Sequence, residues 1–222
     1  MPRLARIIVP GMPHHITQRG NYRQNVFGDD NDRRHYLVWM AEYSKKYGLQ
    51  VLAYCLMSNH VHFIVIPKDE DSIARAFNTS HMRYSQYRNK KSNTTGHLWQ
   101  GRFFSCVMDD KHLTLAARYI ERNPVRAHIV KKPYEYPWSS AKDHSGITHT
   151  SIIDAHGLFN YIEIPQDGWE GFIDAQDRAE DISMIRKYSM TGRPLGNESF
   201  IQKLEKQLGK RVRALPVGRP KK

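Results

Sequence analysis

The sequence predicts an α+β fold, in which helices pack on a central antiparallel sheet, and three observations lead to it. Two β-rich segments, 50–57 and 60–67, are separated only by Ser58 and Asn59, a spacing that predicts an antiparallel hairpin. Segments with apolar residues at helical spacing precede and follow this hairpin. The longest apolar runs have the length of a strand, so no transmembrane helix is expected.

The remaining elements alternate between strands and helices along residues 1–135. Besides the hairpin, strands are expected near 14–18 and 98–108. Helices are expected over 29–48, 69–91 and 111–123. Pro124 removes a backbone donor and so ends the third helix, after which an extended segment is expected over 125–133.

The regular alternation stops near residue 135, which predicts one domain over 1–135 and a C-terminal extension over 136–222. The extension is expected to be mostly helical and to end in a basic, flexible tail. Its helices are expected near 138–144, 168–190 and 197–209. From Lys203 to Lys222 there are eight Lys or Arg residues and one Glu, which makes this region strongly basic.

The charge of the chain favours a polyanionic partner. Lys and Arg total 34 against 22 Asp and Glu, a net charge of +12 with a pI near 9.7. Arg and Tyr interleave over 81–91, where cations suit phosphates and aromatic faces suit unpaired bases. The N-terminus lacks the apolar core of a secretory signal, and the two cysteines form no C-x-x-C pair. These features predict a cytoplasmic, nucleoid-associated protein with no membrane partner.

Two histidines, His60 and His62, begin the second strand of the hairpin. Residues i and i+2 of a strand point to one face, so the two imidazoles lie together, roughly 6.5 to 7 Å apart along the strand. Neutral imidazole is a common metal ligand, and two such ligands leave an open coordination sphere, as catalytic metals require. Each histidine alone could equally be a half-buried aromatic side chain, and the pattern names neither the metal nor the reaction.

The helix over 111–123 offers a nucleophile and a further ligand. Tyr119 and Asn123 are four residues apart and share one helix face. The carbonyl of Asn is a hard oxygen ligand that suits Mg²⁺ or Mn²⁺, and a phenol beside a bound cation can lose its proton below its usual pKa of about 10. The alternative for Tyr119 is an amphipathic side chain at the edge of the core.

These motifs together resemble the one-tyrosine HUH transposases. The shared features are His60-Val61-His62, a helix with Tyr119 followed by Asn123, and the sequence NPVRA at 123–127. Stretches 13–21, 53–63 and 97–103 make the chain most similar to the REP-associated tyrosine transposases within that group. The resemblance implies an HUH nuclease-like sandwich, related to ferredoxin and RRM folds, with 1–135 as its catalytic domain.

The resemblance also implies an activity: a metal-dependent single-stranded DNA endonuclease and strand transferase acting near hairpins. His60, His62 and, by position, Asn123 would hold Mg²⁺ or Mn²⁺, although the ligands alone equally admit Zn²⁺. Tyr119 would form a 5′-phosphotyrosine intermediate, from which strands can be rejoined. Some relatives carry Gln where this chain has Asn123, which could instead cap the helix before Pro124. The implied partner is single-stranded DNA with hairpin or palindromic elements. Relatives include homodimers that donate Tyr across subunits and monomers with a self-contained site, and both remain open for this chain.

Four arginines are candidate DNA contacts: Arg19, Arg102, Arg193 and Arg219. Arg193 and Arg219 lie in the segments TGRPLG (191–196) and GRPKK (218–222), which resemble the C-terminal extension of many REP-associated members. Their GRP tripeptides also resemble the core of an AT-hook. Two other functions remain open: a catalytically idle DNA-hairpin (REP) binding protein, and an unrelated metal hydrolase that uses the H-x-H pattern.

Overall fold

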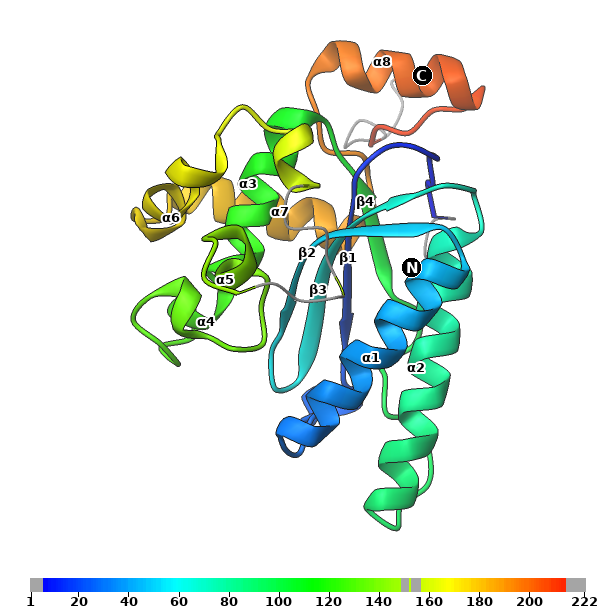
Figure 1. Cartoon of the computed structure of the whole chain (residues 1–222). Helices are drawn as coiled ribbons and strands as arrows, with labels where there is room; N and C mark the ends of the chain where they lie inside the picture. Colours follow the sequence, from blue (N-terminus) through cyan, green and yellow to red (C-terminus); the bar gives the residue numbers. More distant parts are fainter. Residues whose placement is uncertain (1–5, 149–151, 153–156, 215–222) are drawn as a thin grey trace, which may run out of the picture.

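Four antiparallel strands form the single sheet of the computed structural model, which describes residues 6–148, 152 and 157–214 (Figure 1). The strands are β1 (His14–Arg19), β2 (Leu49–Leu56), β3 (His60–Pro67) and β4 (Phe104–Val107). Their order across the sheet is β2-β3-β1-β4, and every neighbouring pair is antiparallel. The α+β fold class and the hairpin expected from the sequence are confirmed.

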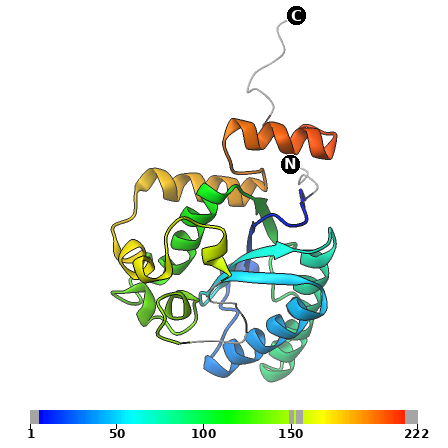
Figure 2. The ribbon, with the colours of Figure 1, turned by 45° about the horizontal axis from the view of Figure 1, so that its top comes forward.

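Helices cover both faces of this sheet. On one face lie α1 (Asp30–Lys46) and α2 (Ser72–Lys91), and on the other lie α3 (Asp110–Glu121) and α7 (Ala179–Thr191) (Figures 1 and 2). Strand β3 shows why both faces are apolar: Phe63 packs in the core beneath α1 and α2, whereas Ile64 packs in the core beneath α3. The alternation of side chains along β3 therefore follows the pattern predicted from the sequence.

Strand β4 is shorter than the segment 98–108 suggested. Residues 98–103 form a loop in which Gly101 has a positive φ of 65°, a conformation that favours glycine and ends regular pairing. The loop crosses the end of β1, where Trp99 pairs with Gly20 and the amide of Gln100 donates to the carbonyl of Arg19 over 2.8 Å. Only residues 104–107 continue as a strand beside β1.

The extended segment expected over 125–133 is wrong. After α3 the chain turns directly into a short helix, α4 (Asn123–Arg126), in which Pro124 stands in the first turn. The amide of a residue in the first turn has no intrahelical acceptor, so proline loses nothing there. A new helical turn thus begins at Asn123, with only Arg122 between it and the end of α3, and residue 127 onward leaves the helix.

The helices expected after residue 135 are present. They are α5 (Ala141–His144), α6 (Gln166–Asp174), α7 and α8 (Glu198–Leu208), with the 3-10 turn η3 (Leu158–Asn160) between α5 and α6. Two further 3-10 turns, η1 (Asn21–Arg23) and η2 (Pro133–Glu135), lie earlier in the chain. Helix α7 contacts β4 and β1, and Ser139 forms a bridge with Cys55 of β2. None of the helices in the described ranges is long and apolar enough to cross a membrane. The domain boundary at residue 135 stays a prediction, and most of the predicted tail (215–222) lies outside the described residues.

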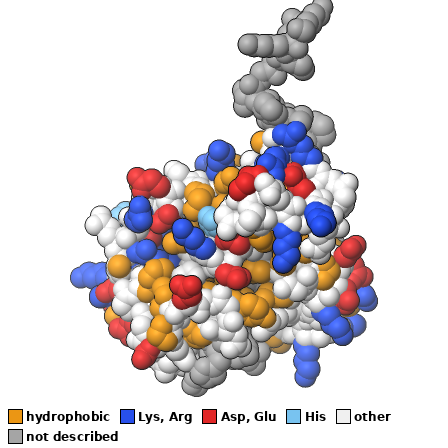
Figure 3. All heavy atoms as spheres, turned by 90° about the horizontal axis from the view of Figure 1, so that it is seen from above, with side chains coloured by type: hydrophobic (Ala, Val, Ile, Leu, Met, Phe, Trp, Pro, Cys, Tyr) orange, Lys and Arg blue, Asp and Glu red, His pale blue; other side chains and the backbone are white. Residues whose placement is uncertain are grey.

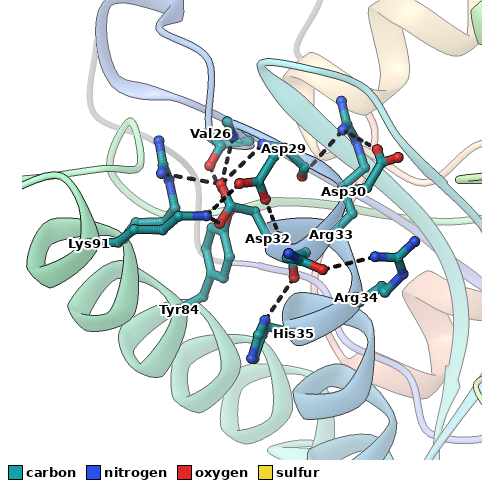
Figure 4. A network of polar contacts seen from close by, with 12 residues as sticks. Val26, Asp29, Asp30, Asp32, Arg33, Arg34, His35, Tyr84 and Lys91 are labelled. Atoms are coloured by element: carbon teal, nitrogen blue, oxygen red, sulfur yellow. Dashed lines mark hydrogen bonds and ion pairs between the residues drawn. The ribbon is translucent and has the colours of Figure 1, made fainter.

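A polar cluster ties the start of α1 to the end of α2, on the face away from β3's histidines (Figure 4). Asp29 caps α1 by accepting from the amide of Asp32, and Lys91 of α2 bridges both carboxylates at 2.7 Å. Close by, the hydroxyl of Tyr84 donates to the carbonyl of Val26 over 2.7 Å. Because the Asp32 side chain is fully buried, its paired charge fixes the relative positions of these two helices.

A second buried cluster joins α3 to the segments that follow it. Glu121, at the end of α3, accepts from Ser140 Oγ over 2.5 Å and from Trp169 Nε1 over 2.8 Å. Its Oε1 also lies 2.5 Å from His144 Nδ1 of α5. All four side chains are buried, so α3, α5 and α6 are held together by one carboxylate that no solvent screens.

We expect Glu121→Gln to lower the free energy of unfolding by about 2 kcal/mol, because the new NH₂ group faces a buried donor instead of accepting from it. Urea denaturation at pH 7.5 measures the change. The matched control is Glu42→Gln, whose carboxylate forms an exposed pair with Arg83 at 3.0 Å and should change stability by less than about 0.5 kcal/mol. Equal effects of the two substitutions would contradict the role of Glu121 as a buried acceptor that stabilises the fold.

Candidate metal and nucleophile site

The two histidines of β3 lie on the face of the sheet covered by α3. Their ring centroids are 5.0 Å apart with the planes nearly perpendicular. His60 is partly buried and His62 is 6% exposed. The strand therefore presents both imidazoles to one small region near the hairpin turn, as the spacing in the sequence predicts.

One nitrogen of each ring is engaged by a neighbour, and the other is free to bind a ligand. His60 Nδ1 lies 2.6 Å from the Asn59 side-chain oxygen, and His62 Nδ1 lies 2.9 Å from His15 Nε2. Among the described residues, neither His60 Nε2 nor His62 Nε2 has a hydrogen-bond partner. This is the arrangement of metal-binding histidines, in which a hydrogen bond to one nitrogen orients the other toward the ion.

Tyr119 lies beside His62. Its ring centroid is 5.9 Å from that of His62, at a nearly perpendicular angle, and the residue is 8% exposed. The guanidinium of Arg126 lies 4.2 Å from the centre of the phenol ring, donates to the carbonyl of Tyr119 and pairs with Asp177 at 3.2 Å. Helix α3 thus brings its tyrosine to the histidine pair, and Arg126 of α4 holds the ring in place.

Asn123 follows Tyr119 by one helical turn, at the start of α4, and is 9% exposed. Its side-chain Nδ2 is buried without a hydrogen-bond partner. Asn123 is the first residue of α4, and Arg122 stands at both the C-cap of α3 and the N-cap of α4. An unpaired Nδ2 is a donor and would suit an oxygen acceptor, whereas a metal ion would bind Oδ1, so direct metal ligation by Asn123 stays a prediction.

Burial sets the charge state of the site. Desolvation lowers the pKa of His15 to about 4, and desolvation together with the nearby charge of Arg19 lowers the pKa of His60 to about 4. The pKa of His62 falls well below its usual value, first through burial and then through His60 and His15. The rings are therefore neutral at pH 7, which is the form that binds a metal ion.

The donor set fits a divalent cation with an open coordination sphere. His60 and His62 would offer two imidazole nitrogens, and Asn123, at the start of α4, would add an amide oxygen. Within the described ranges no group of three or more His, Cys, Asp or Glu side chains could enclose a metal ion. An ion held here would need oxygen ligands from water or substrate, as in catalytic sites, and the protein ligands leave Mg²⁺, Mn²⁺ and Zn²⁺ open.

The candidate DNA-binding arginines are placed differently. Arg19 pairs with His60 across β1 and β3, and its charge acts on both histidines of the site. Arg102 lines a cavity of about 480 Å³ beside β1, together with Gln18 and Trp99. Arg193 lies beside β4, where its side chain donates to the carbonyl of Val212 over 3.4 Å and its carbonyl accepts from Cys106 Sγ over 3.0 Å. Arg219 lies outside the described residues.

On the face seen from above, the basic side chains do not form one continuous surface. Seen from above, Lys and Arg side chains alternate with Asp and Glu and with apolar patches (Figure 3). Some of the cations are neutralised by neighbours, as Arg213 is by Glu198 at 2.9 Å and by Glu205 at 3.0 Å. The net charge of +12 therefore indicates a polyanionic partner without locating its path over this face.

Sequence reasoning missed three side chains of the site: His15, Arg126 and Ser189. His15 stacks on His62 with centroids 5.1 Å apart, and Ser189 of α7 lies 2.7 Å from His15 Nδ1. The alternation of β1 could have placed His15 on the same face as His62, because Thr17 pairs with His62 and shares that face. Nothing in the helical pattern of α7 distinguishes Ser189 from any other serine.

Comparisons with known proteins show which family the chain is similar to. The model of the family described as "Transposase IS200 like" matches residues 8–123. A Haemophilus influenzae protein assigned to the REP-associated tyrosine transposases is 25% identical over 143 residues, which are 56% of this chain and 81% of that protein. A solved structure of a REP-associated tyrosine transposase bound to a REP hairpin shares the fold, with a TM-score of 0.53 and 19% identity over 69% of this chain and 98% of the other.

The matched residues include β1 to β4, α3 and Asn123, and so the whole histidine–tyrosine cluster apart from Arg126 and Ser189. The resemblance expected from the sequence is confirmed by these matches. The chain belongs to the family of IS200-like transposases.

Proposed function

We propose that the chain is a metal-dependent single-stranded DNA endonuclease and strand transferase that acts near DNA hairpins, with Tyr119 as its nucleophile. One observation carries the proposal: the phenol of Tyr119 lies 5.9 Å from His62, whose Nε2, like that of His60, is free of hydrogen bonds in the described structure. Membership in a transposase family and a related structure bound to a REP hairpin support DNA hairpins as the substrate.

Tyr119 performs the covalent step. Its hydroxyl loses a proton and its oxygen forms a bond to the scissile phosphorus, while the bond from phosphorus to the 3′ oxygen breaks. The leaving oxygen gains a proton and becomes a free 3′-OH, and the DNA on the other side of the cut stays on the protein through its 5′ phosphate, as a phosphotyrosine. A 3′-OH can reverse this step and join strands without an external energy source, because the phosphodiester energy is kept in the linkage.

The surrounding residues bind and orient the phosphate. His60, His62 and Asn123 hold the divalent cation, Mg²⁺ or Mn²⁺, which when bound supplies positive charge to the phosphate as negative charge develops. Arg19 lies next to His60 on the same face, where its guanidinium suits a phosphate oxygen. Arg126 keeps the Tyr119 ring against His62 through its contact with the ring and the backbone. The choice between a monomer and a homodimer stays open.

A denaturing gel tests the proposal. A labelled single-stranded hairpin from DNA flanking the gene is incubated with the protein and Mn²⁺ or Mg²⁺, with and without EDTA. We expect an SDS-resistant protein–DNA band that needs the metal and disappears in Tyr119→Phe, because phenylalanine keeps the ring but has no oxygen. The matched control is Tyr134→Phe, which removes a hydroxyl from a partly buried tyrosine of the same core and should keep the band.

Two other outcomes would contradict the proposal. Tight binding of several flanking hairpins in a native gel without any covalent band would indicate a hairpin-binding protein that performs no chemistry. Metal-dependent hydrolysis of small phosphoesters that persists in Tyr119→Phe would indicate an unrelated metal hydrolase.

A further inference from the structure

We propose that His15 and Ser189 are positioning residues that hold His62 in the tautomer with a proton on Nδ1 and a bare Nε2, ready to bind the metal. The inference deepens the proposed function and rests on its metal site. It concerns a hydrogen-bonded chain that runs from α7 through β1 to β3, and it assigns to the segment after residue 135 a part in the site.

The direction of this chain is set by the hydroxyl of Ser189. A serine hydroxyl has one proton, and Ser189 Oγ donates it to the carbonyl of Ile185, one turn earlier in α7, over 2.7 Å. The same oxygen lies 2.7 Å from His15 Nδ1. Because its only proton is already used, Ser189 Oγ must accept there, and so His15 Nδ1 carries a hydrogen.

The hydrogen bond between His15 and His62 then determines which nitrogen of His62 carries a hydrogen. A neutral imidazole carries a single N–H, so a proton on His15 Nδ1 leaves His15 Nε2 as an acceptor. That nitrogen lies 2.9 Å from His62 Nδ1, which must therefore donate. His62 then has a bare Nε2. The reverse order would put a hydrogen on His62 Nε2, and this nitrogen could not bind a cation.

Burial keeps water from changing which ring nitrogens carry the hydrogens. His15 is 2% exposed and Ser189 is 6% exposed, and the rings of His15 and His62 are stacked with an angle of 22° between their planes. Buried polar groups keep the partners that the packing gives them, since exchanging them leaves a donor or acceptor unpaired. The hydrogen-bonded series from Ser189 through His15 to His62 is therefore a fixed part of the fold.

The position of Ser189 is itself fixed by the sheet. Just after α7, the amide of Leu195 donates to the carbonyl of Val107 over 2.9 Å, and the amide of Asp109 donates to the carbonyl of Leu195 over 3.1 Å. These bonds attach the end of α7 to the end of β4. Ser189 lies beyond residues 8–123, the part that matches the family, so a later segment completes the environment of His62.

The first test reads the tautomer directly, in the metal-free protein. Long-range ¹H–¹⁵N correlation spectra of ¹⁵N-histidine-labelled protein at pH 7.5 distinguish protonated from bare ring nitrogens. We expect both His15 and His62 to carry their hydrogen on Nδ1. In Ser189→Ala we expect His15 to lose this preference, because its Nδ1–H has no acceptor. A hydrogen on His62 Nε2 in the wild-type protein would overturn the inference.

The second test measures Mn²⁺ affinity, by electron paramagnetic resonance of the free ion in the absence of DNA. His15→Leu removes the acceptor for His62 and should weaken binding about 10- to 100-fold, the usual cost of losing the partner of a metal-bound histidine. Ser189→Ala should weaken it by a smaller factor. His15→Gln should restore part of the affinity, because its side-chain oxygen can accept where Nε2 does. Unchanged affinity in folded His15→Leu would overturn the inference.

Matched controls separate this role from general damage to the core. His14→Gln replaces the neighbouring histidine of β1, which is equally buried but binds Val9 and Met12 instead. Ser80→Ala removes a buried hydroxyl of α2. Both should leave Mn²⁺ affinity unchanged even if they lower stability. Absence of Mn²⁺ binding in the wild-type protein would overturn the proposed metal site, and the spectra would still decide the order of hydrogens separately.

Discussion

Replacing both His60 and His62 with alanine is expected to abolish divalent-metal binding and the covalent protein–DNA product while hairpin binding persists. The double variant retains only the amide of Asn123 among the proposed ligands, and a single neutral amide oxygen does not hold a divalent cation against water. DNA affinity depends instead on arginines and lysines spread over the surface, which the substitutions leave in place. Both alanines fit strand β3, because alanine is smaller than histidine and adds no atoms to the core.

Two measurements separate these effects. Electron paramagnetic resonance should show no Mn²⁺ bound at millimolar concentration, and native gels should show hairpin affinity within about threefold of the wild-type value. The matched control is the double variant His35→Ala, His128→Ala, which removes two exposed imidazoles and should keep both metal binding and the covalent product. A metal-dependent covalent product in the His60, His62 double variant would refute this site.

The residues of the site that could be predicted from the sequence are those whose spacing matches the period of a strand or of a helix. The period of two along β3 places His60 and His62 on one face, and the helical period places Tyr119 and Asn123 on another. The strand face and the helix face are both apolar further along, so packing of α3 on β3 brings the histidines to the tyrosine. The fold class followed from the same patterns, since a two-residue turn leaves the hairpin no other arrangement.

The parts that could not be predicted depend on contacts between distant residues. His15 and Ser189 are separated by 174 positions, and no local pattern links a strand residue to a serine that far along the chain. The missing amide proton of Pro124 predicts a helix end, but the chain restarts a helix at Asn123, and in the first turn of that helix the proton is not needed.

Acidification is expected to destabilise the protein strongly, because the folded protein buries neutral histidines that do not ligate the metal. His14 is fully buried, accepts from the amide of Val9 over 3.2 Å and donates to the carbonyl of Met12 over 2.7 Å. His81 stacks on Trp99 at 4.3 Å and bonds the hydroxyl of Tyr36 over 2.8 Å. Burial lowers the pKa of His14 to about 4 and that of His81 to about 3.

The sign follows from proton binding. In the unfolded chain a histidine has a pKa of about 6.5, so between pH 6.5 and 4 the unfolded state binds more protons than the folded state, and stability falls as the pH falls. Each of the two groups costs about 2 kcal/mol between pH 7.5 and 5, since one pKa unit corresponds to about 1.4 kcal/mol. The sum of about 4 kcal/mol is a large share of a typical total of 5–15 kcal/mol. Above about pH 7 the same groups contribute no pH dependence.

Urea denaturation in EDTA at several values between pH 4.5 and 8 measures this dependence. The slope of the free energy of unfolding against pH should correspond to two or more protons taken up on unfolding at pH 5, because His15 and His60 shift in the same direction. In His81→Gln, which keeps a partner for Tyr36, the slope should fall by about one proton. The exposed His128→Gln should leave it unchanged. A protein as stable at pH 5 as at pH 7.5 would show that these histidines are protonated within the fold, which their buried neutral hydrogen bonds do not allow.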